Sequence, residues 1–119
     1  SQAADIHVEF QRHGTDKRLT PNVEMALYRI AQEALNNVSR HAQAPQADLT
    51  ITFNPQEVVM QVSDNGRGFE VPNSPAEFAP GGHFGLLGLY ERAELIGARL
   101  EIHSAPGQGS RIAVHLPYA

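Results

Sequence analysis

Hydrophobic residues alternate with polar ones in five short stretches of the chain. This alternation has the period of a half-buried strand, and it predicts strands over Asp5–Gln11, Ala47–Phe53, Glu57–Ser63, Arg99–Ser104 and Arg111–Leu116. In the first of them we expect the apolar side chains to face the core, and we expect the polar run HGTDKR that follows to turn the chain; the apolar set is Ile6, Val8 and Phe10.

Two other stretches carry hydrophobic residues at helical spacing. The longer one predicts a helix from Pro21 to Ala42, with Thr20 as its N-cap and Pro21 as its first residue. The shorter one predicts a helix from Leu86 to Ile96, stopped by Gly97. Between the two, the segment DNGRGFEVPNSPAEFAPGGHFG is dense in Gly and Pro, and a loop of about 20 residues in a compact domain is usually functional or disordered.

The strand pattern indicates the fold class. A doubly wound parallel sheet needs strands that are apolar throughout, whereas these strands mostly alternate, so one face of the sheet is covered and the other meets water. We therefore expect an α+β domain with a two-layer α/β sandwich, and the 119 residues are enough for one such domain, 1–119.

Composition and charge narrow the functional classes. The chain has no Cys, so there is neither a disulfide framework nor a thiolate metal site. A net charge of -4 argues against broad electrostatic binding to nucleic acid. No apolar run approaches the roughly 20 residues of a membrane span, and the start SQAADIHVEF lacks the pattern of a signal peptide. A cytoplasmic location is compatible with these features.

The end of the long helix, EALNNVSRHA, is unusually polar. Asn and Ser are poor helix-interior residues because their side chains compete for backbone hydrogen bonds. Glu33, Asn37 and His41 form one stripe at the border of the apolar face, where half-buried polar groups need partners. The alternative is an ordinary solvated flank.

Two glycine pairs follow. In DNGRGF, Asp64 ends a strand and Gly66 and Gly68 open the loop, which allows close approach of backbone to a ligand but is also ordinary turn chemistry. Gly85 and Gly88 in HFGLLGLYERA stand at a predicted helix start, where free N–H groups favour phosphate. Neither pair fits a Walker loop or a dinucleotide fingerprint.

The order of the motifs decides between these alternatives. ExxxNxxRH on a helix, then DNGRGF, then GLLGL, then GQGS before the last strand, resembles the N, G1, G2 and final glycine boxes of the ATP-binding domain of sensor histidine kinases. The closest resemblance is to the nitrate-sensor-like subfamily, whose helix is similar to LYRIAQEALNNVSRHA. The resemblance runs from about Ile6 to the end. It implies a Bergerat fold, with a mixed, mostly antiparallel sheet covered on one face by helices and an ATP lid at about 70–87.

The resemblance also assigns roles on the helix. It implies that Asn37 ligates a Mg²⁺ ion that bridges the ATP phosphates, and that Glu33 orients the metal or accepts a proton. Arg40 and His41 would reach towards phosphate. A hard cation with oxygen ligands suits this set.

The remaining roles implied by the resemblance concern the nucleotide. Asp64 would accept the adenine amino group, and Gly66 and Gly68 would shape the floor of the adenine pocket. Ser110 would contact the base through water. Residues at the lid end would bracket the phosphates, namely Gly85, Leu86, Gly88 and Leu89.

These roles imply the catalytic domain of a two-component sensor kinase. It would bind Mg-ATP and pass the γ-phosphoryl to a histidine on a separate helical dimerisation domain, and from there to a response regulator. We expect a monomeric fragment of a homodimeric kinase and the cytoplasmic part of a membrane-anchored sensor. The alternative is an ATPase or regulatory module of the same superfamily without histidine kinase activity.

The other histidines offer no competing site. We expect His7, His103 and His115 on strands and His13 and His83 in loops. Two histidines without a third ligand, such as the pair on the last two strands, are more often surface residues than a metal site.

Overall fold

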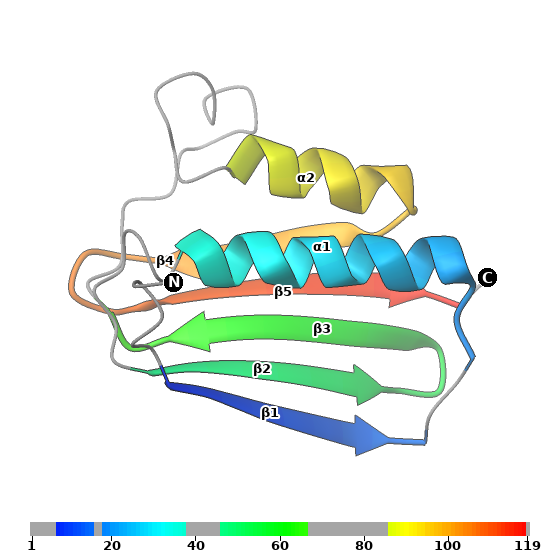
Figure 1. Cartoon of the computed structure of the whole chain (residues 1–119), viewed down its shortest axis with the longest axis horizontal. Coiled ribbons are helices and arrows are strands. Elements are labelled where there is room, and N and C mark those ends of the chain that lie inside the picture. Colours follow the sequence, from blue (N-terminus) through cyan, green and yellow to red (C-terminus); the bar gives the residue numbers. More distant parts are fainter. Residues whose placement is uncertain (1–6, 16–17, 38–45, 67–85, 119) are drawn as a thin grey trace.

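One mixed sheet with two helices on one face makes up the described part of the chain (Figure 1). The computed structural model describes residues 7–15, 18–37, 46–66 and 86–118, without the side chains of Asn37 and Leu86. The elements in chain order are β1 (His7–Gly14), α1 (Pro21–Asn37), β2 (Gln46–Phe53), β3 (Glu57–Asp64), α2 (Leu86–Leu95), β4 (Arg99–Ser104) and β5 (Ser110–Pro117).

The strands follow the order β1-β2-β3-β5-β4 in the sheet. β1 and β2 are parallel, and the other three neighbouring pairs are antiparallel. This is the two-layer α+β sandwich that the strand pattern predicts, with the mixed, mostly antiparallel sheet that the resemblance implies.

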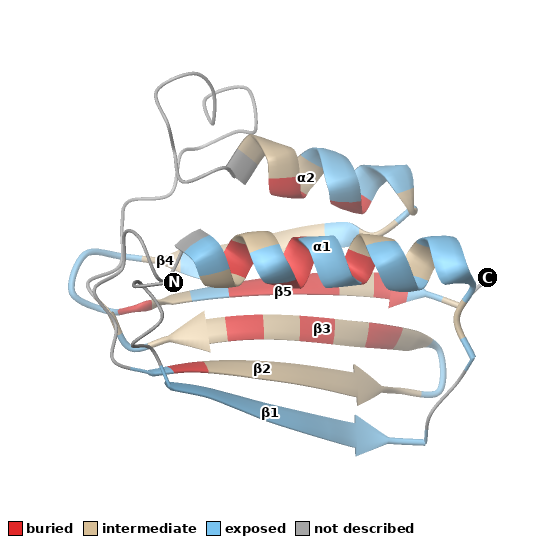
Figure 2. Ribbon diagram, in the orientation of Figure 1, coloured by how far each residue is buried: buried red, intermediate tan, exposed pale blue. Residues whose placement is uncertain are grey.

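Helix α1 begins where the sequence predicts. The hydroxyl of Thr20 accepts a hydrogen bond from the N–H of Val23 at 3.3 Å, so Thr20 is the N-cap. The helix turns its apolar stripe, which includes Ile30 and Ala34, into the core (Figure 2). The predicted continuation of this helix over 38–42 lies outside the described residues.

The core lies between the helices and the middle of the sheet. Alternate residues of β3 are buried, as the period of two requires. Fully or nearly fully buried residues from both layers meet there, including Leu27, Ile30, Val62, Leu89, Ala93 and Val114. Helix α2 ends at Leu95, one residue before the prediction. Gly97, two residues further on, takes a φ of +75° and lets the N–H of Ala98 donate to the carbonyl of Ala93 at 2.9 Å.

The first strand differs from the prediction in its extent. It continues past Gln11 to Gly14, because Gly14 pairs with Phe53 of β2 and its φ of +87° permits the close approach. The polar run predicted to turn the chain therefore starts inside the strand, and His13 lies on a strand rather than in a loop.

The predicted burial of this strand is wrong for its described residues. Every residue of β1 is exposed, with Val8 at 42% and Phe10 at 57%. The physical reason is position: β1 is an edge strand, whereas α1 packs against β3 and α2 against β4 (Figure 2). Ile6 lies outside the described residues.

The strand β3 extends one residue beyond the prediction, and β5 extends one residue beyond it at each end. β3 includes Asp64 and β5 begins at Ser110, and these two residues pair across the antiparallel ladder. The extension brings together two residues that are 46 positions apart in the chain.

Candidate functional site

The carboxylate of Asp64 is held from two sides at the end of β3. The backbone N–H of Gly66 donates to Oδ1 at 2.7 Å, and the hydroxyl of Ser110 donates to Oδ2. Both contacts are partly buried. Since each carboxylate oxygen has two lone pairs, Asp64 can still accept a hydrogen bond from a ligand in a fixed direction.

The turn between β4 and β5 lies directly against this aspartate. Gly109 is buried and has a φ of +73°, and a Cβ there would overlap the carbonyl oxygen of Asp64. Only glycine fits such a position. The hydroxyl of Ser104, the last residue of β4, donates to the carbonyl of Gly109 at 3.0 Å.

A cavity of about 630 Å³ opens at this corner, lined by the end of β3 and by the turn between β4 and β5. Asp64, Ser104, Gly109 and Ser110 are among its lining residues. The volume is within the range of small-molecule sites, and the acceptor described above faces it from one wall.

The polar end of α1 lies at the same end of the molecule. Several segments lie together at the left of Figure 1: the C-terminal end of α1, the end of β3, the turn between β4 and β5, and the start of α2. Glu33 is half-buried, as expected for a residue bordering the apolar face, and Asn36 is exposed. Asn37, one turn after Glu33, is the last residue of α1.

Helix α2 supplies the second glycine segment. It begins at Leu86, as predicted, and Gly88 is half-buried in its first turn. Leu89 is fully buried in the core, so its side chain packs against other apolar residues, and only its backbone remains for the role that the resemblance implies.

Several predicted site residues lie outside the described part of the chain. They are Arg40, His41, Gly68 and Gly85, with most of the lid segment predicted at 70–87. Sequence reasoning missed Ser104, because a serine in an alternating strand carries no signal of its own. The signal for Gly109 was present in the GQGS motif.

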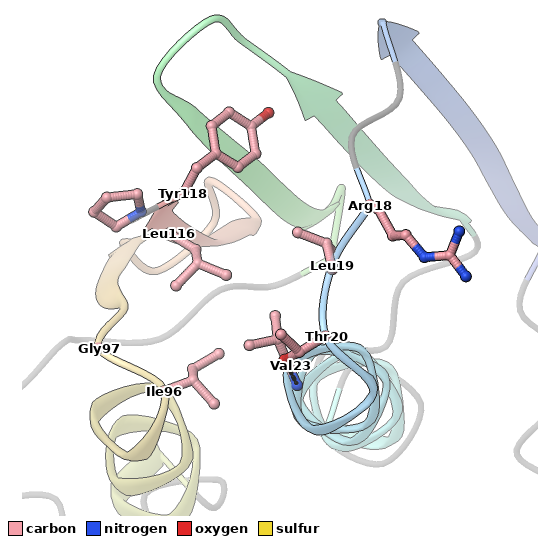
Figure 3. A pocket seen from close by; sticks show the side chains of 9 residues that line it. Arg18, Leu19, Thr20, Val23, Ile96, Gly97, Leu116 and Tyr118 are labelled. Carbon is pink, nitrogen blue, oxygen red and sulfur yellow. Dashed lines mark hydrogen bonds between the residues drawn. The ribbon is translucent and has the colours of Figure 1, made fainter.

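A second cavity, of about 470 Å³, lies at the opposite end of the molecule. Figure 3 shows Leu19, Val23, Ile96 and Leu116 converging on it, whereas the guanidinium of Arg18 points away. Its apolar wall is a poor environment for phosphate, so the first cavity is the better candidate for chemistry.

The outward face of the sheet carries a histidine–glutamate network. Glu101 of β4 contacts His115 Nε2 through Oε1 at 2.9 Å and His103 Nε2 through Oε2 at 3.2 Å. His115 Nδ1 lies 3.5 Å from Glu57 of β3. Hydrogen bonds from His103 and then from His115 lower the pKa of Glu101 below its ordinary value of 4.5, with burial opposing them.

The histidines of this network therefore share a carboxylate. Within the described ranges, no group of three or more His, Cys, Asp or Glu side chains is placed to hold a metal ion. We infer that the network helps to hold β3, β5 and β4 together.

Comparison with known families gives a match over most of the chain. Residues 22–119 match the family model described as histidine kinase-, DNA gyrase B-, and HSP90-like ATPase, a range that contains all four motifs. The chain belongs to this ATPase family. The expected resemblance to the ATP-binding domain of histidine kinases is thereby confirmed.

Relatives of this ATPase domain are signalling proteins. This chain is 33% identical over 112 residues to the signal transduction histidine-protein kinase/phosphatase DegS of Bacillus subtilis. The match covers 94% of this chain and 29% of that protein. The chain is 31% identical over 112 residues to the oxygen sensor histidine kinase NreB of Staphylococcus carnosus, covering 94% of this chain and 31% of that protein. The chain thus spans less than a third of the length of these relatives.

Solved structures share the fold of this ATPase domain. The blue-light activated histidine kinase of Erythrobacter litoralis matches with a TM-score of 0.74 at 18% identity, over 97% of this chain and 38% of that one.

In the part of the chain that the structure describes, no helix combines the length and the hydropathy needed to cross a membrane.

Proposed function

We propose that this chain is the ATP-binding catalytic domain of a sensor histidine kinase. It binds Mg-ATP and donates the γ-phosphoryl to a histidine on a separate helical dimerisation domain, from which the phosphoryl passes to a response regulator. The observation that carries the proposal is the doubly anchored carboxylate of Asp64 at the wall of the cavity. The names of the relatives support the kinase assignment.

The anchored carboxylate suits adenine. The adenine 6-amino group donates a hydrogen bond, whereas guanine and hypoxanthine carry a carbonyl at that position and offer Asp64 no donor there. A hydrogen bond to a charged acceptor contributes about 1.5–3 kcal/mol, so adenine is favoured by about tenfold or more. Gly66 and Ser110 already hold the two carboxylate oxygens of Asp64. Binding of adenine therefore costs little additional conformational entropy at this side chain.

The end of α1 suits a hard cation bound to phosphates. The C-terminal end of α1 lies at the same end of the molecule as the end of β3 (Figure 1). Its residues Glu33 and Asn37 are one turn apart in the sequence, and carboxylate and amide oxygens are the ligands that such a cation prefers. A bound Mg²⁺ ion neutralises charge on the transferring phosphoryl group. In our proposal Asn37 holds the ion without adding a negative charge, and Glu33 orients the metal or accepts a proton.

The proposal also covers residues around the phosphates and the setting of the domain in the cell. Arg40 and His41 approach phosphate, the glycines Gly68 and Gly85 border the nucleotide, and the domain lies on the cytoplasmic side of a membrane-anchored, homodimeric sensor. The rival function is nucleotide binding or hydrolysis without transfer to histidine, since both need the same pocket.

Calorimetric titration with ATP, with and without Mg²⁺, tests the nucleotide part of the proposal. For Asn37→Ala we expect the Mg²⁺-dependent gain in ATP affinity to shrink while metal-free binding persists. The matched control is Asn36→Ala, one residue away and exposed, which should keep the full gain. An equal Mg²⁺ gain in wild type and Asn37→Ala would remove Asn37 from the metal site.

A further inference from the structure

The turn between β4 and β5 is exposed at residues 105–108, and Gly107 and Gly109 both take positive φ angles. A hydrogen bond from the N–H of Gln108 to the carbonyl of Ala105 at 2.9 Å closes its tip. Ser110, the first residue of β5, lies where this turn joins the strand ladder, so a hydrogen bond at the base of the turn can adjust the position of its side chain.

Ser104 supplies such a bond. Its hydroxyl donates to the carbonyl of Gly109 at 3.0 Å in a partly buried contact, closing the turn from the β4 side. Ser104 pairs with Ser110 across β4 and β5, and Ser110 pairs with Asp64 across β5 and β3. The three side chains thus stand in one row on the same face of the sheet.

This row of side chains links Ser104 to the carboxylate of Asp64, although the two residues are not in direct contact. The bond to Gly109 holds the residue immediately before Ser110, and Ser110 in turn donates to Asp64 Oδ2. Gly66 holds only the other oxygen. If Ser110 moves, the carboxylate keeps one anchor and can rotate, and its preference for a particular donor direction weakens.

We propose that Ser104 is a positioning residue for adenine recognition, acting through Gly109 and Ser110 on the carboxylate of Asp64. This inference rests on the proposed function. It predicts a specific pattern: loss of the Ser104 hydroxyl weakens the contact to the 6-amino group of the base and leaves the contacts to ribose and phosphates unchanged.

The test compares ATP with inosine triphosphate, which carries a carbonyl in place of the 6-amino group. For Ser104→Ala we expect the dissociation constant for ATP to rise about threefold to tenfold, the usual range for one hydrogen bond. The dissociation constant for inosine triphosphate should stay within about twofold of wild type, because this ligand has no 6-amino group to donate to Asp64. Both are measured by calorimetry with Mg²⁺ present.

Two further variants separate positioning from folding. Ser104→Thr retains the hydroxyl and suits a strand, so it should restore ATP affinity. Thr52→Ala, which removes a hydroxyl from a half-buried strand position at the far end of the sheet, should bind both ligands as wild type does. Circular dichroism melting curves establish that each variant is folded at the temperature of titration.

Each outcome is decisive. If Ser104→Ala binds ATP as tightly as wild type, or if it loses affinity for ATP and inosine triphosphate by the same factor, Ser104 has no role in base recognition and the inference is overturned. If wild type does not distinguish the two ligands, or binds neither, the assignment of Asp64 fails first and the inference fails with it.

Discussion

At the scale of single residues, the site depends on how Asp64 is held. The motif DNGRGF pointed to Asp64 and Gly66 from the sequence, and the resemblance added Ser110 near the base. The structure adds the direct contact between Asp64 and Ser110, where the resemblance implied only a contact to the base through water. That contact could not be read from the sequence, because it depends on the register between two strands that are distant in the chain.

For Asp64→Asn we predict a fall of at least tenfold in ATP affinity with the fold retained. The amide oxygen can still accept from Gly66, and the amide N–H₂ can donate to Ser110 if the hydroxyl turns round. The charged acceptor for the adenine amino group is lost, which costs about 1.5–3 kcal/mol of binding free energy. Calorimetry measures the affinity, and unchanged ATP binding in a folded variant would remove Asp64 from the site.

At the scale of elements, burial was harder to predict than secondary structure. Alternation identified β1 as a strand, yet the same pattern arises whether or not a helix covers the apolar side. The helices pack over β3, β5 and β4 and leave β1 at the open edge, so Val8 and Phe10 are exposed. The start of α1 and the end of α2 were predicted to within one residue because capping is local: Thr20, Pro21 and Gly97 act within a few residues of themselves.

The turn between β4 and β5 allows a matched pair of glycine substitutions. Both Gly107 and Gly109 have positive φ angles, but only at Gly109 would a Cβ meet neighbouring atoms, those of Asp64 and Asn65. We predict that Gly107→Ala loses about 1–2 kcal/mol of stability from backbone strain alone and keeps its ATP affinity. Gly109→Ala should be less stable than Gly107→Ala and should bind ATP more weakly, because the turn must move away from Asp64.

Urea unfolding and calorimetry measure the two effects separately. Equal stability and equal ATP affinity in the two variants would show that the contact between the turn and Asp64 is not close in solution.

The histidine–glutamate network predicts a pH dependence of stability. The folded-state pKa of Glu101 lies below its ordinary value of 4.5, so in acid the unfolded chain binds more protons than the folded one. The stabilisation is therefore present above about pH 4.5 and is lost as the pH falls through the folded-state pKa of Glu101. Glu101→Gln should remove this part of the acid sensitivity.

Unfolding free energies of wild type and Glu101→Gln between pH 3 and pH 7 provide the check. The difference between them should shrink towards the acid end, and His103→Gln, which removes the largest cause of the lowered pKa, should reduce the dependence in part. A difference that is constant over this range would contradict the coupling.

At the scale of the whole molecule, we propose that the phosphoryl acceptor is a histidine on a separate helical domain. Every histidine among the described residues lies on a strand of the sheet: His7, His13, His103 and His115. The order of the four motifs was enough to predict the family and the sandwich. It could not predict which partner the domain serves, because that information lies in contacts with other domains.

Transfer of labelled phosphate tests the central claim most directly. The chain is incubated with γ-labelled ATP and Mg²⁺, alone and with the helical phosphoacceptor domain of the same kinase added in trans. We predict that the chain stays unlabelled and that the added domain gains acid-labile phosphate, slowly because the two are not tethered, with Asp64→Asn greatly reducing the transfer. Stoichiometric acid-labile label on the chain itself, or an ATP-saturated chain that never labels the added domain, would contradict the account.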